Sequence, residues 1–258
     1  MSANASQDWN PEAYARFRGL RLRPALDLLA QVGDLPAGDV VDLGCGDGAM
    51  AAVLRARFAD RRLIGVDRSP AMLAQAQGYD ALVEADAAAW RPDAAPALIF
   101  SNAALHWLPD HAVLLPRLAG YLAKGGVLAV QMPRQFFAPS HRFLRDIAQA
   151  MFPDRFDFAH YVPPVATAVE YCEMLAGLGA IDAWETDYIQ RLEAAEAMHP
   201  VRGFTASTAM RPFAEKLNAA ELASFCDRYD AALASAYPAR ADGSVLFPFR
   251  RLFLILKV

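Results

Sequence analysis

Three glycines at alternate positions follow a short apolar run and an acidic residue near the beginning of the chain. The apolar run is Val40–Leu43 with Asp42 inside it, and the glycines are Gly44, Gly46 and Gly48. Glycine allows a tight turn and a close approach of the backbone to a ligand, because it has no Cβ to clash. The spacing differs from the G-x-G-x-x-G of dinucleotide sites, and here the carboxylate precedes the first glycine. An ordinary glycine turn fits the same residues, so positions downstream must decide between a turn and a binding loop.

Two further acidic residues end apolar runs downstream of the glycines. Asp67 ends the run that begins at Arg62, and a carboxylate at the end of a second strand can accept hydrogen bonds from both ribose hydroxyls. Asp86 ends the run that begins at Val83, where it is placed to bond with an adenine amino group. Glycines and acids together favour a nucleotide cofactor without a pyrophosphate, such as S-adenosylmethionine, over the cofactor of a dehydrogenase.

Strand and helix signals alternate from residue 40 to 132 and supply the frame for these groups. Such alternation predicts a parallel sheet with helices on both faces. Strands are expected at 40–43, 62–67, 83–86, 97–101 and 127–132, with two more at 181–188 and 251–256. The predicted fold is therefore α/β, a Rossmann-like and mostly parallel seven-stranded sheet in a single domain over 1–258. Segments at about 134–165 and 190–245 are expected to form a helical cap over the carboxyl ends of the strands, where such folds bind ligands.

Several helix ends carry recognisable signals. The apolar run after Gly48 predicts a first helix over 49–54, and Ser69-Pro70 is typical of an N-cap and first helical position. A helix from about 111 to 122 is expected to end before Gly125, which is a C-cap signal. Helices are also expected near 141–151, over 167–178 and through much of 200–237.

Composition narrows the class of protein. A chain of 258 residues with 55% hydrophobic and 21% charged residues can bury a large core, which argues against disorder. A net charge of −4 gives no general attraction to nucleic acid or to an anionic membrane, and no apolar run is long enough to span a bilayer. The three cysteines, Cys45, Cys172 and Cys226, are odd in number and widely spaced, which is typical of reduced thiols in the cytoplasm. In the glycine loop, the small size of Cys45 explains its presence better than reactivity.

Residues 40–132 resemble the class I S-adenosylmethionine-dependent methyltransferases, and motifs outside this core resemble one family among them. The opening and closing motifs are similar to those of trans-aconitate 2-methyltransferases. They include Trp9-Asn10-Pro11, Tyr14, Phe17, Arg21, Arg23-Pro24, Ser69-Pro70-Ala71-Met72, Trp107-Leu108-Pro109-Asp110-His111, Gly126–Pro133, Arg211-Pro212, Tyr237-Pro238 and Arg251-Leu252-Phe253. The resemblance thus spans nearly the whole chain. The sequence differs from the family pattern at four positions. Asp47 stands where proline is common, His106 where glutamine is familiar, and Phe204 and Phe213 where tryptophan is expected.

The resemblance implies S-adenosylmethionine as cofactor and trans-aconitate, or a closely related small polycarboxylate, as methyl acceptor. The cofactor would then be held by Asp42, Gly44, Cys45, Gly46, Gly48, Asp67, Arg68, Met72, Asp86, Ala87, Asn102 and Trp107. A carboxylic acid is already ionised at neutral pH, so methyl transfer to its oxygen needs no general base and no catalytic residue is expected. Catalysis would rest on holding the carboxylate in line with the methyl carbon and the leaving sulfur.

The remaining carboxylates of such an acceptor need cationic or hydrogen-bonding partners. Arginine fits this task because its planar fork pairs two oxygens at once. The family positions that match are Tyr14, Arg21, Arg23, His106, Arg211 and Arg251. Taken singly, each arginine is better explained as a solvated surface charge than as a ligand, and this holds least for Arg251, which stands at the head of an apolar strand. An N-terminal helix is expected to start at Trp9-Asn10-Pro11 and to carry Tyr14, and it fits either a surface helix or a lid over the cofactor.

His106-Trp107 follows the expected fourth strand, at the end that faces cofactor and acceptor. Packing under a neighbouring helix is favoured for Trp107, while His106 is equally consistent with a structural role and a hydrogen bond to the acceptor. The histidines show no metal-ligand spacing, so no metal site is predicted. Ser101 lacks the setting of a nucleophile elbow, which argues against a hydrolase.

Three functions remain open from the sequence. The first is a small-acid O-methyltransferase acting on trans-aconitate or a close relative. The second is methylation of another acceptor, such as a malonyl thioester on a carrier protein. The third is a non-catalytic module that binds S-adenosylmethionine. No nucleic-acid or membrane partner is expected, and the sequence does not determine the oligomeric state.

Overall fold

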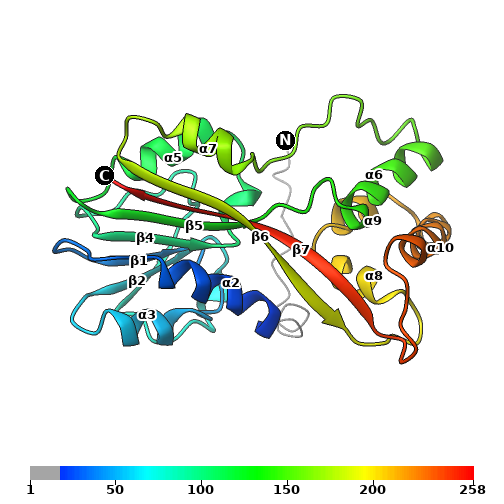
Figure 1. The fold of residues 1–258 in the computed structure, drawn as a ribbon, viewed down its shortest axis with the longest axis horizontal. Coiled ribbons are helices and arrows are strands. Elements are labelled where there is room, and N and C mark those ends of the chain that lie inside the picture. The colour runs from blue at the N-terminus through cyan, green and yellow to red at the C-terminus, as the bar shows by residue number, and fades with distance from the viewer. Residues whose placement is uncertain (1–17) are drawn as a thin grey trace. The chain divides into compact units, whose positions relative to one another are not determined.

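A computed structural model describes residues 18–258 and shows a chain that divides into two compact units (Figure 1). Unit 1 holds the described residues up to Pro133, with Pro164–Glu185 and Leu252–Val258. Unit 2 holds Arg134–Pro163 and Thr186–Arg251. Tyr14 and the other residues before Arg18 lie outside the described part of the chain.

A seven-stranded sheet has the order β3-β2-β1-β4-β5-β7-β6. Its strands are β1 (Val40–Leu43), β2 (Leu63–Asp67), β3 (Ala81–Glu84), β4 (Leu98–Asn102), β5 (Val127–Pro133), β6 (Ala180–Leu192) and β7 (Val245–Lys257). Strand β1 pairs in parallel with both β2 and β4, β2 with β3, and β4 with β5. Strands β6 and β7 run in opposite directions, so the sheet also contains an antiparallel pair (Figure 1). The prediction of an α/β fold is confirmed, and the parallel part is the segment from β3 to β5.

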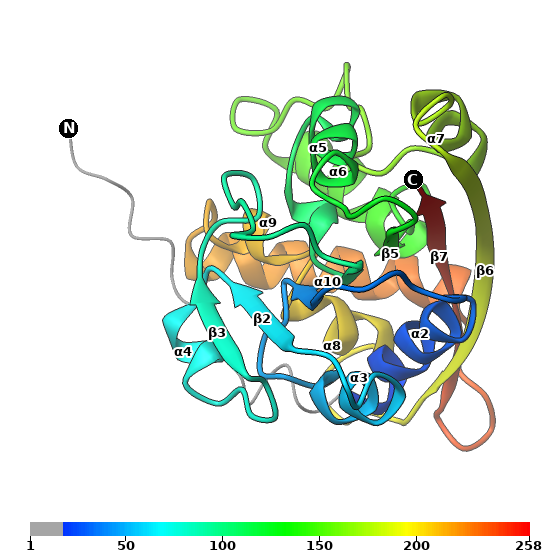
Figure 2. The same cartoon turned by 90° about the vertical axis from the view of Figure 1, so that its left-hand side faces the viewer.

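Helices of unit 1 cover both faces of the parallel strands. They are α2 (Arg18–Ala30), α3 (Ala51–Arg57), α4 (Pro70–Leu73), the 3-10 turn η1 (Leu105–Trp107), α5 (His111–Ala119) and α7 (Ala168–Met174). Helices α5 and α7 lie on one face and α2 and α3 on the other, as both ribbon views show (Figures 1 and 2). Strands buried from both sides read as continuous apolar runs, and β1 and most of β4 and β5 are buried accordingly.

Short local signals explain where the helices begin. The Ser69 hydroxyl accepts a hydrogen bond from the Met72 amide at 3.3 Å, and Pro70 occupies the first turn of α4. Thr167 and Glu170 form a capping box at the start of α7. Both starts follow the sequence signals, whereas several helices end earlier than expected, since α5 stops at Ala119 and α7 at Met174.

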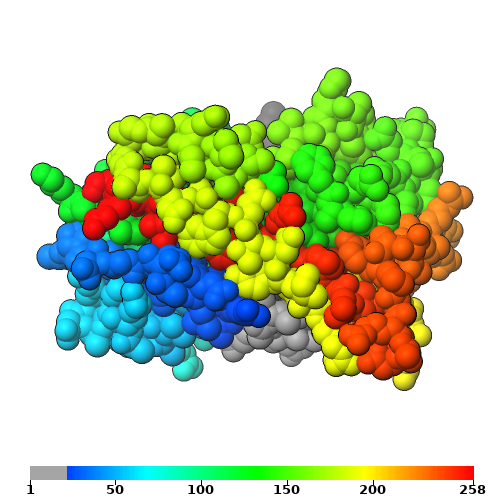
Figure 3. Space-filling model, in the orientation of Figure 1, coloured from blue at the N-terminus to red at the C-terminus, as the bar shows by residue number. Residues whose placement is uncertain are grey.

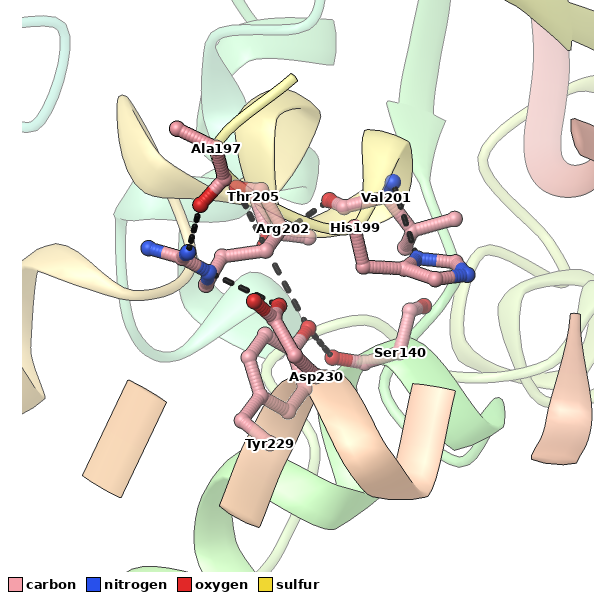
Figure 4. Close-up of polar contacts among 8 residues, drawn as sticks. All are labelled: Ser140, Ala197, His199, Val201, Arg202, Thr205, Tyr229 and Asp230. Atoms are coloured by element: carbon pink, nitrogen blue, oxygen red, sulfur yellow. Dashed lines mark hydrogen bonds and ion pairs between the residues drawn. The ribbon is translucent and has the colours of Figure 1, made fainter. Parts of the chain in front are cut away.

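Unit 2 is built from four helices, α6 (Pro139–Met151), α8 (Pro200–Ala206), α9 (Arg211–Ala214) and α10 (Ala219–Ala236), together with the adjoining parts of β6 and β7. A polar network joins three of the helices (Figure 4). The Tyr229 hydroxyl of α10 donates to the Ser140 carbonyl of α6 and shares a 3.3 Å contact with the Thr205 hydroxyl of α8. Arg202 Nε donates to Asp230 Oδ1 at 2.7 Å, which ties α8 to α10 a second time.

Three strand predictions need correction. The third strand ends at Glu84, so Asp86 lies in the turn beyond it rather than at its end. The closing strand begins at Val245 rather than Arg251, because Val245, Phe247 and Phe249 alternate inward while the residues between them are exposed. Strand β6 likewise continues to Leu192, and its exposed side chains lie at the molecular surface (Figure 3, yellow). That the segments of unit 2 cap the strand ends stays a prediction.

Candidate functional site

The glycine loop follows β1 and has a backbone that only glycine adopts without strain. Gly44, Gly46 and Gly48 have φ angles of +81°, +56° and +82°. A Cβ on Gly44 would lie 2.2 Å from the Cβ of Ala104, so the loop packs directly against the segment that follows β4. The strands β1 and β4 are neighbours in the sheet, and their carboxyl ends therefore meet at this loop.

Asp67, at the end of β2, is bonded to the glycine loop. Its Oδ2 atom accepts a hydrogen bond from the Gly46 amide at 2.9 Å, and its Oδ1 atom accepts one from the Ser69 amide at 2.9 Å. The parallel register that places Leu43 beside Val66 brings these elements together. The second acidic residue of the sequence pattern thus lies beside the first loop.

Asp42 is buried one residue before the end of β1, with 3% of its surface exposed. The Tyr79 hydroxyl donates to its Oδ2 atom at 2.7 Å. Burial raises the pKa of Asp42 to about 7, the hydrogen bond from Tyr79 lowers it in part, and the nearby Asp67 carboxylate raises it. Burial and the two neighbouring carboxylates also raise the pKa of the Cys45 thiol, which keeps it protonated and supports a packing role for Cys45.

The other predicted cofactor residues lie around the ends of β2, β3 and β4. Arg68 is exposed, and Met72 is buried in α4. Asp86 is exposed in the turn after β3, where its Oδ1 atom accepts a hydrogen bond from the Ala88 amide at 2.8 Å. The carbonyl of Ala87 accepts a hydrogen bond from Arg117 Nη2 at 3.0 Å.

The segment after β4 contains a strained residue and an exposed tryptophan. Asn102 ends the strand, and Ala103 has a left-handed φ of +53° that few residues other than glycine adopt. The turn η1 then places the His106 and Trp107 rings 4.6 Å apart. Trp107 is 45% exposed, so the preference for packing under a helix was wrong. Its indole is accessible from solvent in the same segment that touches the glycine loop.

Comparison with known proteins assigns the chain to a family. A family model described as a methyltransferase domain matches residues 14–180. A trans-aconitate 2-methyltransferase from Methylobacterium radiotolerans is 43% identical, over 97% of this chain and 98% of its own length. The enzyme of the same name from Methylobacterium nodulans is 44% identical over the same shares of the two chains. The chain belongs to the trans-aconitate 2-methyltransferase family. The resemblance inferred from the sequence motifs is thereby confirmed.

Solved structures with much lower identity share the fold. The YcgJ protein from Bacillus subtilis matches with a TM-score of 0.55 and 16% identity, over 90% of this chain and 97% of its own. Phosphoethanolamine N-methyltransferase 2 from Haemonchus contortus, in complex with S-adenosyl-L-methionine, matches with a TM-score of 0.51 and 18% identity. This match covers 91% of the present chain and 52% of the Haemonchus protein, so the chain spans about half of that protein's length. At these identities the likeness shows the methyltransferase fold alone.

The residues predicted for the acceptor are distributed over both units. In unit 1, Arg21 and Arg23 lie in α2, and the Arg23 side chain is 77% exposed with its Nε 4.0 Å from Asp27. His106 belongs to η1. In unit 2, Arg211 begins α9 and has its Nη2 atom 3.6 Å from Glu215. High exposure makes Arg23 the weakest candidate of this group.

Arg251 is the most buried arginine among the acceptor candidates whose side chains the structure describes. It lies in β7 with 3% exposure, and its guanidinium carbon is 4.7 Å from the centre of the Phe249 ring. The ring of His141 lies 6.3 Å from the same phenylalanine. Burial and the nearby Arg145 lower the pKa of His141 to about 3, so this histidine is neutral at physiological pH.

Two groups were missed by sequence reasoning. Tyr79 stands alone between α4 and β3, and no spacing rule links it to Asp42. Gln190 of β6 is 3% exposed, and neither atom of its amide has a hydrogen-bond partner within residues 18–258. A polar residue inside an alternating apolar strand was the available signal for Gln190. In the described part of the chain, no helix could cross a membrane, and no group of three or more His, Cys, Asp or Glu side chains could hold a metal ion.

Proposed function

We propose that this chain transfers the methyl group of S-adenosylmethionine to a carboxylate of trans-aconitate and forms a monomethyl ester. The proposal rests on two relatives that are named trans-aconitate 2-methyltransferase. They are 43% and 44% identical to this chain over nearly the full length of both sequences. The glycine loop bonded to Asp67 is the matching structural feature.

The cofactor would lie across the carboxyl ends of β1, β2 and β4. Gly44–Gly48 would face the methionine part, because the glycines leave the backbone accessible there. Asp67 would accept the ribose hydroxyls, since each carboxylate oxygen keeps a second acceptor direction beyond its bond to an amide. Asp86 and the exposed Trp107 would contact the adenine. Cys45, Arg68, Met72, Ala87 and Asn102 complete the proposed cofactor set.

The reaction is an in-line displacement at the methyl carbon. The attacking carboxylate is ionised at neutral pH and the sulfonium is a good leaving group, so no proton needs to move. The chain therefore has to position the two reactants and exclude water. The proposal names no catalytic residue for this reason.

The non-reacting carboxylates of the acceptor need partners that are already held in place. Arg251 is suited to this role because its guanidinium is buried and stacked beside Phe249, so binding immobilises little further. We assign Arg211, Arg21, Tyr14 and His106 supporting roles, and the reduced state of the three free cysteines fits a reaction in the cytoplasm.

The test is transfer of a labelled methyl group to a panel of di- and tricarboxylic acids and to a malonyl thioester on a carrier protein. Trans-aconitate should give the highest kcat/KM in the panel, and the product should be a monomethyl ester by mass spectrometry. A preference for the carrier-bound thioester would replace the acceptor assignment. Binding of S-adenosylhomocysteine with no transfer to any acceptor would indicate a binding module instead.

The acceptor residues are tested by Arg251→Ala and, separately, Arg211→Ala. Loss of a buried ionic partner costs several kcal/mol, so kcat/KM for trans-aconitate should fall by about two orders of magnitude while the Kd for S-adenosylhomocysteine stays at the parent value. Arg251→Lys should recover part of the loss, because an ammonium lacks the bidentate fork. Arg142→Ala, which removes a half-exposed arginine of unit 2 paired with Asp146, is the matched control. Parent-like kinetics in both test variants would exclude these arginines from the acceptor site.

A further inference from the structure

Tyr79 lies against β1, the glycine loop and β2. Its hydroxyl donates to Asp42 Oδ2 at 2.7 Å. A Cβ on Gly48 would lie 3.2 Å from its Cε2 atom, and a Cβ on Gly65 would lie 3.1 Å from its Cδ1 atom. The ring therefore fills space left by a glycine of the loop and a glycine of β2. This packing fixes the direction in which the hydroxyl points.

Asp42, which accepts the hydrogen bond from Tyr79, is a buried carboxylate with a second carboxylate nearby. Asp42 is 3% exposed, and the carboxylate of Asp67 on the adjoining strand acts on it unfavourably. Cys45 is close by and uncharged, and Asp47 in the loop acts on Tyr79 itself. A carboxylate in such surroundings takes up a proton unless hydrogen bonds or a cation stabilise its charge.

In the proposed pose, S-adenosylmethionine would supply a cation at this place. The methionine part of S-adenosylmethionine carries an ammonium group, and the proposed pose puts that part against the glycine loop. The loop N–H groups only donate hydrogen bonds and so do not pair with an ammonium, while the loop carbonyls can accept from it but carry no charge. Asp67 accepts from the ribose in the proposed pose. Of the remaining carboxylates, Asp47 lies within the loop and Asp42 lies in β1 directly before it, and Asp42 is the one that the Tyr79 hydroxyl holds.

We infer that Tyr79 is a positioning residue for the cofactor, whose hydroxyl keeps Asp42 ionised and oriented towards the cofactor ammonium. This inference rests on the proposed function, because it uses the proposed pose of S-adenosylmethionine. Tyr79 touches neither the methyl group nor the acceptor, so its effect reaches the reaction through Asp42. The consequence is cofactor affinity that depends on pH near neutrality.

Tyr79→Phe tests the inference without removing the ring that fills the space beside the glycines. The Kd for S-adenosylhomocysteine is measured by calorimetry from pH 6 to 8. In the parent, affinity should fall as the pH is lowered through about 7 and Asp42 becomes protonated. In Tyr79→Phe the midpoint should rise by about one pH unit, which weakens binding roughly fivefold at pH 7 and only about twofold at pH 8. Asp42→Asn should bind weakly and show no such dependence on pH.

Two controls separate this role from a structural one. The ligand control is 5′-methylthioadenosine, which lacks the ammonium and should bind the parent and Tyr79→Phe equally. The protein control is Tyr171→Phe, another buried tyrosine of unit 1, whose hydroxyl contacts His111 instead. It should leave the pH profile for S-adenosylhomocysteine unchanged. A uniform loss for both ligands at every pH would mean that Tyr79 only supports the fold, and would overturn the inference.

A direct measurement of the carboxyl group completes the test. Carbon-13 NMR of aspartate-labelled protein, with the Asp42 signal assigned by its absence in Asp42→Asn, should show titration near pH 7 in the parent and about one unit higher in Tyr79→Phe. Equal midpoints would overturn the inference. If the parent binds neither S-adenosylhomocysteine nor 5′-methylthioadenosine, the proposed function fails, and that result is distinct from an unshifted profile in a protein that binds.

Discussion

Asp67 holds the glycine loop in place, and in the proposed pose the same carboxylate accepts the ribose hydroxyls. Its oxygens already hold the Gly46 and Ser69 amides at 2.9 Å, so the side chain shapes the loop before any ligand binds. Hydrogen bonds to a charged group are stronger than neutral ones and are worth about 1.5–3 kcal/mol. A ribose that bonds to Asp67 would therefore meet a group whose position is already fixed.

At the residue scale we expect Asp67→Ala to weaken binding of S-adenosylhomocysteine by about ten- to a hundredfold, because both the ribose contact and the Gly46 anchor are lost. Isothermal titration measures the effect. Glu84→Ala is a matched control, since Glu84 lies beside Asp67 in the register of β2 and β3 and is exposed. The same Kd in Asp67→Ala and the parent would place the ribose elsewhere.

Spacing predicted the glycines and acids of this site because their roles follow from local backbone conformation. Gly44 needs a positive φ, and Asp67 ends a strand next to the loop, and both requirements are visible in a few residues of sequence. Tyr79 was missed because its partners are distant in sequence: the contact to Asp42 spans 37 positions. The exposure of Trp107 was missed because the sequence alone does not show which face of a short turn is covered.

At the element scale, helix α10 depends on a capping box. Asn218 Oδ1 accepts from the Glu221 amide at 3.0 Å, and Glu221 Oε2 accepts from the Asn218 amide at 2.9 Å. Arg155 also donates to both carboxylate oxygens of Glu221. These hydrogen bonds lower the pKa of Glu221 to about 2, so the cap keeps its charge in mild acid.

We expect Asn218→Ala to lower the free energy of unfolding by about 1 kcal/mol, because one orphan amide of the first turn loses its acceptor. Denaturation in urea measures the change. Asn218→Asp, which keeps the acceptor oxygen and the negative charge at the helix start, should stay within about 0.5 kcal/mol of the parent. Equal losses in both variants would show that something other than the cap has been disturbed.

Elements with regular periodicity were predicted from the sequence, and those that depend on pairing were not. Strands β1 and β2 matched their apolar runs closely, since buried parallel strands read as continuous hydrophobic segments. The length of β7 was underestimated because Pro248 and Arg250 interrupt its apolar pattern. Arg250 pairs with Asp187 on the other strand at 2.8 Å, and such a cross-strand contact is not visible from one strand.

At the scale of the whole molecule, both compact units contain carboxylates whose pKa values are lowered by paired arginines, and in unit 1 the example is Asp80 beside Arg55. Unit 2 contains paired carboxylates with lowered pKa values, such as Asp187 beside Arg250 and Asp242 beside Ser244 and Arg191. Such groups stabilise the fold above their unfolded pKa and lose that contribution in acid. Unit 1 contains Asp42, whose pKa is raised, so its contribution has the opposite sign.

The sign for Asp42 follows from proton binding. The pKa of this carboxyl is 3.8 in the unfolded chain and about 7 in the folded chain, so between these values the folded state holds a proton that the unfolded state has released. Stability therefore falls as the pH rises from about 4 to 7 and is level above that, with a total loss of about 4 kcal/mol for a shift near three units. Below pH 4 both states are protonated, and the penalty is absent.

We therefore expect Asp42→Asn to match the parent in stability below pH 4 and to exceed it by several kcal/mol at pH 8, because asparagine is neutral throughout and can still accept the hydrogen bond from Tyr79. Calorimetric unfolding at the two pH values measures the difference, and subtracting parent from variant removes the contribution of the carboxylates in unit 2. Saturating S-adenosylhomocysteine should narrow the gap at pH 8, since its ammonium stabilises the ionised Asp42 of the parent and binding to the folded state adds stability. A difference between the two proteins that does not change with pH would mean that Asp42 is ionised in the folded chain across the whole range, and that the buried carboxylate is already compensated without the cofactor.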